Sequence, residues 1–294
     1  MIELRIAQYN VHNIRKTMTL LSASEHAHQY DMIAIQEPAK QKNKFATFCE
    51  SNSSFQPLYP LDRYARVCFL LNKRIPSYSW DIEHVCQDAA ILILHANNTT
   101  LTVTNIYNEC HPASSINPQS PIWGLEDIFT RPGEHILLGD MDLHHPSWST
   151  KTTRPDKMAE ELLNITGGAG LALMTPRDMV TWRKTPDSNL TSTLDLTFVS
   201  EHLKQLVERC ESDGLLHHSS DHMPISILIT LPGWGATNPG CQERHGEEQI
   251  LTWLELAANT CGCPMASPRE VQLINSQHIY ATSRWTWQSR PHPT

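Results

Sequence analysis

Apolar and polar residues succeed one another along the first 231 residues in a pattern that predicts strands and helices in turn. Residues 2–11 alternate between apolar and polar side chains, which predicts a first strand. Compact aliphatic runs predict further strands at 31–36, 66–72, 89–95, 101–107, 136–138, 171–174, 179–183, 192–199 and 225–231. Helical spacing predicts helices at 17–29, 122–130, 156–166 and 201–209. This succession is typical of an α/β fold.

Two segments lack a clear pattern. Residues 39–64 are polar and predict a long surface loop with some helix. Beyond Pro232, glycine and proline interrupt the chain, and only 248–258 keep an amphipathic helical pattern. We therefore expect one domain over 1–232 and a linker-like tail over 233–294. The tail holds a set of possible zinc ligands whose spacing matches no common zinc site, which favours a chance grouping: Cys241, His245, Cys261 and Cys263.

Composition narrows the class of protein. A chain of 294 residues with 40% hydrophobic content can bury a large core. The formal net charge of −8 provides no overall basic surface, so contact with nucleic acid would need a local positive patch and a metal ion beside the acidic groups. The eight cysteines follow no metal-binding or paired spacing, which indicates reduced thiols. No signal peptide or run of about 18 apolar residues is present, so we expect a soluble intracellular protein with no membrane partner.

Candidate chemistry begins where the predicted strand at 136–138 ends. Gly139 allows the backbone to turn there, and Asp140 and Asp142 follow. In an extended segment these two carboxylates point to the same side, where they repel unless a divalent cation or a shared proton offsets their charge. A metal site is the economical interpretation. Turn formation by an Asp-x-Asp sequence after glycine remains the alternative.

Other polar residues also lie at or beside the ends of predicted strands. Each has an ordinary interpretation by itself, as a strand end, a half-buried aromatic residue or a surface turn. Their shared position makes coincidence improbable and predicts one site, formed by Asn10, Glu37, Tyr107, Asp140, Asp142, Asp195, Asp221 and His222.

Over residues 1–231 the ordered motifs resemble those of the endonuclease/exonuclease/phosphatase superfamily of metal-dependent phosphohydrolases. The motifs are Gln8–Val11, Ile35–Pro38, Asn105–Asn108, Gly139–Asp142, Leu194–Asp195 and Ser220–His222. Three further segments are similar to the endonuclease domains of LINE-type retrotransposons: His144–Trp148, Val180–Trp182 and Ser192–Phe198. Tyr9–Val11 and Arg66–Phe69 are similar to the Tad-like elements of fungi.

The resemblance implies a fold and an activity. The expected fold is a DNase I-like four-layered α/β sandwich, with two mixed sheets face to face, helices outside and the active site at one end. The expected activity is Mg²⁺-dependent nicking of double-stranded DNA, which leaves a 3′-hydroxyl for target-primed reverse transcription. The resemblance also implies a nuclear location and a reverse transcriptase of the parent element, which this chain does not contain.

For the metal, the resemblance implies that Glu37 is the principal ligand of a single Mg²⁺, which Mn²⁺ can replace. Asn10 would hold the hydration shell of the ion or the phosphate, and Asp221 would assist its placement. Oxygen ligands suit this hard cation.

For the reaction, the resemblance implies that Tyr107 donates a hydrogen bond to the phosphate. Asp140 would orient or deprotonate the attacking water, and His222, charged through Asp195, would stabilise the pentacoordinate phosphate. The division of the base role between Asp140 and His222 stays open.

Further residues are assigned to substrate contact: Asn108, His144, Trp148, Ser192, Thr193 and Ser220. For the His144–Trp148 segment, bracing of the active-site loop is favoured over zinc binding. Basic residues that could contact DNA phosphates are Arg63, Lys73, Arg74, Lys151, Arg154, Arg183 and Lys184, each of which is otherwise a solvated surface charge.

Two residues depart from the superfamily pattern. Asp142 stands where Asn is usual, and an ionised carboxylate accepts hydrogen bonds but cannot donate one to a phosphate. His12 stands where abasic-site nucleases carry Asp, which argues against abasic-site specificity. Asp142 therefore favours a second hypothesis. In this hypothesis the domain has lost its catalytic activity and persists as a folded or binding remnant. A third is a phosphatase acting on a small phosphorylated metabolite or lipid, which the acidic composition favours.

Overall fold

The computed structural model describes residues 2–41, 47, 54–61, 63–96, 99–110, 112 and 116–231. The predicted tail at 233–294 and its predicted helix lie outside these residues, and the boundary near 232 stays a prediction. Within the described residues, no helix has the length and apolar character needed to span a membrane.

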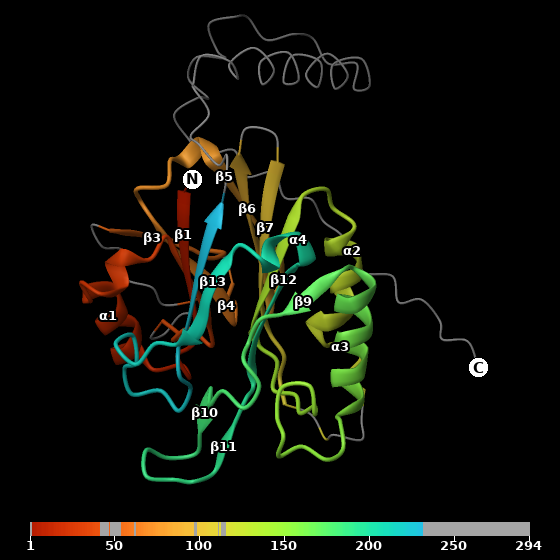
Figure 1. The fold of residues 1–294 in the computed structure, drawn as a ribbon. Helices are drawn as coiled ribbons and strands as arrows, with labels where there is room; N and C mark the ends of the chain where they lie inside the picture. The colour runs from red at the N-terminus through yellow and green to blue at the C-terminus, as the bar shows by residue number, and fades with distance from the viewer. Residues whose placement is uncertain are drawn as a thin grey trace, which may run out of the picture. The chain divides into compact units, whose positions relative to one another are not determined.

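Two six-stranded mixed sheets form the framework (Figure 1). The first sheet has the order β13-β14-β1-β2-β4-β3, from Val207–Ser212, Ile225–Leu231, Ile2–Asn10, Met32–Gln36, Val67–Asn72 and Phe55–Leu58. The second sheet has the order β5-β6-β7-β8-β12-β9, from Trp80–Cys86, Ala89–Ala96, Thr99–Tyr107, Glu134–Asp140, Asp195–Ser200 and Leu171–Leu173. Each sheet contains one parallel pair, β1 with β2 and β7 with β8, and its other pairs are antiparallel.

Helices cover the outer faces of the two sheets. Helix α3 (Lys157–Gly168) places Met158, Leu162 and Ile165 one turn apart on a single face, and they pack with α2 (Leu125–Phe129) on the second sheet. Helix α1 (Arg15–Ala23) packs in the same way on the first sheet. Shorter helical segments are Ala27–Gln29, Ser77–Ser79, Pro121–Gly124 and α4 (Glu201–Lys204).

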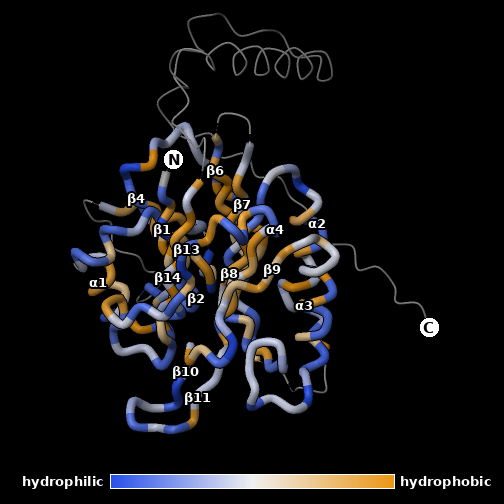
Figure 2. The backbone as a smooth tube through the Cα atoms, viewed as in Figure 1, coloured by the Kyte–Doolittle hydropathy of each residue, from blue (hydrophilic) through white to orange (hydrophobic). Residues whose placement is uncertain are grey.

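An apolar core joins the inner faces of the two sheets. Side chains such as Ile6 and Phe69 of the first sheet cluster with Leu92 and Val103 of the second, all fully buried. The central strands of both sheets are accordingly hydrophobic along much of their length (Figure 2). The predicted four-layered α/β sandwich is therefore confirmed.

Three of the four edge strands of the two sheets, β3, β5 and β13, were not predicted from the sequence. The expected loop at 39–64 contains β3, whose Phe55 and Leu58 are buried. The edge strands β5 and β13 were not predicted, since most of their residues are partly or fully exposed and neither strand has a buried run. The predicted helix at 201–209 ends at Lys204, before β13 begins. Backbone hydrogen bonds to an inner strand stabilise an edge strand without an apolar run, so hydrophobic patterning misses it.

The predicted strands at 179–183 and 192–199 also differ from the structure. Only Trp182–Arg183 (β10) and Thr191–Ser192 (β11) pair, as a small separate hairpin. The strand of the second sheet, β12, starts at Asp195. The chain thus changes partners between 192 and 195, because residues before the break bond within the hairpin and residues after it bond to β8.

Gly139 does not end its strand, which is a correction to the expected turn. Strand β8 continues to Asp140, and Gly139 pairs with Ile106 on one side and Leu196 on the other. Its φ is +149°, and a Cβ atom there would overlap the carbonyl oxygen of Ile106. Glycine is therefore needed so that β7 and β8 can approach next to Asp140.

We expect Gly139→Ala to lower the free energy of unfolding by about 3 kcal/mol, through backbone strain and displacement of β7. Urea denaturation followed by circular dichroism measures this change in the free energy of unfolding. Gly167→Ala is the matched control, since Gly167 lies in α3 with nothing near its missing Cβ, and alanine there should be neutral or slightly stabilising. Equal unfolding midpoints for the two variants would contradict the packing argument.

Candidate active site

The chemically active side chains meet at one end of the sandwich, where the parallel strands finish. Asn10 ends β1, Glu37 follows β2, Tyr107 ends β7 and Asp140 ends β8. Asp140 pairs with Tyr107 in the parallel ladder and with Asp195 in the antiparallel one. Side chains far apart in sequence are therefore neighbours, because parallel strands in adjacent positions end at the same edge.

Polar side chains link the two sheets beneath this end. Gln36 Nε2 donates to Asn105 Oδ1 over 2.7 Å, and Asn105 Nδ2 donates to the backbone oxygens of Ile35 and Cys68. Gln8 Nε2 reaches the Leu196 oxygen at 3.3 Å. These buried amides fix the spacing of the sheets under the site, a role that the sequence motifs did not reveal.

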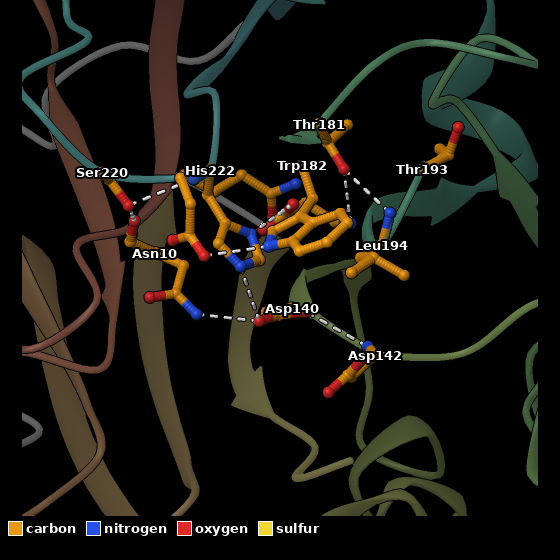
Figure 3. A network of polar contacts seen from close by, with 12 residues as sticks. Asn10, Asp140, Asp142, Thr181, Trp182, Thr193, Leu194, Ser220 and His222 are labelled. Carbon is orange, nitrogen blue, oxygen red and sulfur yellow. Dashed lines mark hydrogen bonds and ion pairs between the residues drawn. The ribbon is translucent and has the colours of Figure 1, made fainter. Parts of the chain in front are cut away.

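Asn10 joins two carboxylates of the site, and its bond to Asp140 is drawn in Figure 3. Its Nδ2 donates to Asp140 Oδ2 at 2.8 Å and to Glu37 Oε2 at 3.2 Å, while its Oδ1 accepts from the His12 backbone at 2.8 Å. The side chain is buried. Asn10 therefore holds two carboxylates from different strands in one orientation.

His222 lies between two buried carboxylates. Its Nδ1 is 2.9 Å from Asp195 Oδ2, and its Nε2 is 3.7 Å from Asp140 Oδ2 (Figure 3). Burial lowers the pKa of His222, but Asp195 and Asp140 together raise it above the ordinary value for histidine. Burial raises the pKa of Asp140; His222 opposes this shift and Asp195 adds to it. The arrangement favours an imidazolium beside a carboxylate that can accept a proton.

Glu37 is held by two amides. Besides Asn10, Asn13 donates from Nδ2 to Glu37 Oε1 at 3.1 Å, and the Asn13 backbone donates to the Glu37 oxygen. Asn13 was missed in the sequence, where only its place two residues after the first motif connects it to the site. Positive φ angles at His12, Asn13, Glu37 and Asp142 concentrate backbone strain here, a feature that often accompanies function.

Asp221 is positioned by the base of the β10–β11 hairpin. Trp182 Nε1 donates to Asp221 Oδ2 at 2.9 Å, and the Arg183 backbone donates to the Asp221 oxygen. Trp182 was noted only as part of a family motif, and its indole is a positioning group that the sequence analysis missed. Asp221 Oδ1 is buried without a hydrogen-bond partner among the described residues.

Glu37 and Asp221 offer oxygen donors for a divalent cation at the edge of this site. The donors are the unpartnered Asp221 Oδ1 and the amide-held Glu37 carboxylate. A second set of possible ligand atoms, from Asp140, Asp195 and His222, lies within 4.8 Å, but His222 already pairs with Asp195 there.

Asp142 and Tyr107 lie at the rim of the network. The Asp142 backbone donates to Asp140 Oδ1 at 3.1 Å. Burial raises the pKa of the Asp142 carboxyl, and a hydrogen bond from the Cys110 thiol opposes this shift. Burial also raises the pKa of Tyr107, which Glu37 raises further, so its hydroxyl remains a hydrogen-bond donor. The Arg66 guanidinium lies 5.0 Å from the Tyr107 ring centre.

Two residues that are predicted to contact substrate support the loop after Asp140, and their substrate contact stays a prediction. Trp148 has no exposed surface, and its Nε1 donates to the Leu143 oxygen at 3.1 Å. Asn108 is buried, with Nδ2 donating to the Met141 oxygen at 2.7 Å. Both side chains hold the segment after Asp140, so the favoured bracing role of Trp148 matches its position.

Thr193 and Ser220 are likewise buried and bonded to backbone. Thr193 Oγ1 donates to the Met179 oxygen at 2.6 Å, and Ser220 Oγ donates to the Asn10 oxygen at 2.7 Å. Both side chains thus support the site, and their contact with substrate stays a prediction. His144 and Ser192 remain partly exposed, and their substrate contact stays a prediction.

Four of the seven basic residues that are predicted to contact DNA lie in two places relative to the site. Lys73 and Arg74 follow β4 at the end of the first sheet remote from the site, where Arg74 pairs with Asp31, so they are removed from the candidate DNA contacts. Lys151 and Arg183 lie at the β10–β11 hairpin, with Lys151 Nζ 2.9 Å from Thr191 Oγ1. The hairpin lies beyond the strand ends where the site is built (Figure 1).

Residues 101–226 match the family model described as endonuclease-reverse transcriptase. No curated protein matches the chain in sequence. Many solved structures match the fold, including the following three. The endonuclease domain of TRAS1, a telomere-specific non-LTR retrotransposon, is 18% identical, with a TM-score of 0.56, over 78% of this chain and 99% of that one.

The second is the AP endonuclease LMAP from Leishmania major, 14% identical with a TM-score of 0.60 over 78% of this chain and 88% of that one. The third is the 3′ phosphatase NExo from Neisseria, bound to a product DNA hairpin, 13% identical with a TM-score of 0.56 over 78% of this chain and 100% of that one. The chain thus shares the fold of these three structures and, over residues 101–226, matches the endonuclease-reverse transcriptase family model.

Proposed function

We propose that the protein is a divalent-metal-dependent DNA endonuclease of the LINE retrotransposon type. It nicks one strand of double-stranded DNA in the nucleus and leaves a 3′-hydroxyl that primes reverse transcription by the polymerase of the parent element. The observation that carries the proposal is the Asn10 network, which joins Glu37 and Asp140 beside the His222–Asp195 pair. The match of residues 101–226 and the likeness to the TRAS1 domain support it.

Water attack on a phosphodiester needs a base and a donor on the phosphate. Asp140 is the base, since its raised pKa lets the Oδ2 carboxylate take a proton from water. His222 is the donor, because Asp195 engages Nδ1 while Nε2 lies too far from Asp140 for a strong hydrogen bond. Nε2–H therefore stabilises charge that develops on a phosphoryl oxygen.

The remaining residues bind and orient the phosphate. The Tyr107 hydroxyl donates to a second phosphoryl oxygen. Glu37 and Asp221 would hold the cation, which when bound offsets the negative charge of the phosphate and polarises it. Asn10 keeps the Glu37 and Asp140 carboxylates in a fixed relation, so that the cation and the base act on the same phosphate.

Conversion of supercoiled plasmid to the nicked circle tests the proposal. We expect nicking with Mg²⁺ or Mn²⁺, none after EDTA, and a loss of about a hundredfold or more in Glu37→Gln, which keeps the side-chain shape but removes the charge that binds the cation. Glu25→Gln, at an exposed position remote from the network, should nick as the wild type does. Nicking that persists in EDTA would contradict a metal-dependent mechanism.

Asp142 supports a second candidate, a catalytically decayed domain that acts only as a folded or binding remnant. Its carboxylate lies beside Asp140, where it adds negative charge near the phosphate position. This candidate predicts intact plasmid with either cation. Release of inorganic phosphate from small phosphorylated substrates, with plasmid untouched, would instead favour a phosphatase.

A further inference from the structure

Arg66 lies directly before β4, and two carboxylates bind its guanidinium. Nε and Nη2 donate to the two carboxylate oxygens of Asp88, with 2.6 Å between Nη2 and Oδ2, and Nη1 donates to Glu109 Oε2 at 2.9 Å. Each guanidinium nitrogen therefore has an acidic partner. The side chain is 22% exposed, and a guanidinium bound in this forked manner keeps one orientation.

The fixed guanidinium lies over the ring of Tyr107. Its Cζ is 5.0 Å from the ring centre, a distance at which a cation is attracted to an aromatic face. The backbone N–H of Tyr107 donates to the Asp88 oxygen at 2.9 Å. The ion pair of Arg66 and Asp88 thus contacts both the ring and the backbone of Tyr107.

The backbone of Arg66 contacts the other sheet edge of the site. The N–H of Glu37 donates to the Arg66 oxygen at 2.8 Å, and the N–H of Arg66 donates to the Gln87 oxygen at 2.7 Å. One residue therefore connects Glu37, after β2, with Tyr107, at the end of β7. The proposed reaction gives this residue no role, although its segment is one of those that the sequence singled out.

Charge adds to this geometry. Burial raises the pKa of Tyr107, the Glu37 and Asp140 carboxylates raise it further, and the Arg66 guanidinium opposes the rise. The cation thereby keeps the phenol a better hydrogen-bond donor than its acidic surroundings alone would allow.

We propose that Arg66 is a positioning residue, which fixes the Tyr107 ring so that the hydroxyl donates to the phosphate. The proposal rests on the proposed function in that Tyr107 is the phosphate donor. Arg66 acts through Tyr107, because its guanidinium nitrogens already donate to Asp88 and Glu109. Lysine cannot replace it, since an ammonium is a point charge that lacks the planar fork.

Single-turnover nicking by Arg66→Lys tests the kinetic part. With saturating DNA and Mg²⁺ we expect a rate about tenfold below the wild type, since a misplaced donor acts in the chemical step. The affinity for a labelled duplex, measured by fluorescence anisotropy, should change by less than about threefold, because the positive charge is kept.

Arg131→Lys is the matched control. Arg131 forms the same kind of forked pair, with Nη1 and Nη2 at 2.7 and 3.1 Å from the carboxylate oxygens of Glu83. It precedes β8, whose other end carries Asp140, so the pair is remote from the site. We expect this variant to nick as the wild type does.

The double variant with Tyr107→Phe separates positioning from a general structural role. Once the hydroxyl is absent, Arg66→Lys should lower the rate further by less than about twofold, because two residues that act as one unit are not additive. A further loss of about tenfold in the Tyr107→Phe background would overturn the proposal, since Arg66 would then act independently of Tyr107.

Nuclear magnetic resonance of the full chain labelled with ¹³C-tyrosine gives a readout that does not need activity. The ring signals of Tyr107 are identified by their loss in Tyr107→Phe. We expect them to shift in Arg66→Lys and, by less, in Glu109→Gln, which removes one partner of the guanidinium at a position that is 57% exposed and should not disturb folding. The signals of the exposed Tyr78 should stay in place.

The outcomes for the two proposals are distinct. Tyr107 signals that stay in place in both variants overturn the assignment of Arg66, whether or not plasmid is nicked. Intact plasmid with the wild type contradicts the proposed function, and the ring signals then decide whether Arg66 orients Tyr107.

Discussion

Replacing His222 with alanine is expected to lower the rate of plasmid nicking by about a thousandfold, which is the scale of losing a positioned proton donor. His222 is held by Asp195 at 2.9 Å, and the two carboxylates around it raise its pKa, so it remains protonated above the pH at which an ordinary histidine loses its charge. Alanine removes the positive group nearest the buried Asp140. The transition state then loses its donor and meets uncompensated negative charge.

The rate of nicking is measured under single-turnover conditions with a saturating cation. Under these conditions the rate reports the chemical step and not the binding of the cation. Because alanine leaves Asp140 and Asp195 buried without a positive partner, a stability control is needed. His222→Gln fills more of the cavity and keeps a neutral donor, and we expect it to fold with an intermediate loss of rate. A rate within about tenfold of the wild type in the folded alanine variant would remove His222 from the reaction.

Replacing Asp142 with asparagine is expected to raise the nicking rate by about a hundredfold. Asparagine can donate a hydrogen bond to the phosphate, whereas the ionised carboxylate accepts only and repels it. The backbone favours the change, since asparagine tolerates the φ of +46° and the N–H bond to Asp140 stays in place. The substitution also removes a charge that raises the pKa of Asp140, so the pKa of Asp140 should fall.

The nicking rates of the wild type and Asp142→Asn, measured in parallel, test this effect. Asp127→Asn is the matched control, because it removes one negative charge at an exposed position. A large gain in Asp142→Asn alone identifies Asp142 as the feature that limits the wild type. Equal rates would mean that the Asp142 side chain does not act on the phosphate, and would remove it as the feature that limits the wild type. Inactivity of both proteins would support the decayed-domain hypothesis.

Inner strands were predicted from the sequence because burial on both faces requires aliphatic runs. Strand β2 is buried at every residue, and β8 is buried from His135 to Asp140. Strands β5 and β13 could not be predicted in this way, because their pairing is satisfied by backbone bonds while their side chains meet solvent. Gly139 was noticed in the sequence for the wrong reason, since it serves the close approach of β7 and not a turn.

The residues of the site also fall into those that the sequence predicts and those that it does not. The sequence placed Asn10, Glu37 and Asp140 at strand ends, and the structure brings both carboxylates within hydrogen-bond distance of Asn10. Residues that orient this set, such as Asn13 and Trp182, carry no signal of their own in a single sequence. Their role depends on contacts across 24 and 39 residues, which only the folded chain creates.

By itself, the sequence of this protein determined the order of the motifs, the inner strands that carry them and the two departures at His12 and Asp142. Hydrophobic periodicity is local, so it can be read without knowing which strands pair. The tertiary structure alone decided which polar side chains are buried supports, as Asn108 and Ser220 are, and which lie beside a site carboxylate, as His12 does beside Asp221. That distinction depends on distances between strands that the sequence separates, and these are set only when the two sheets pack.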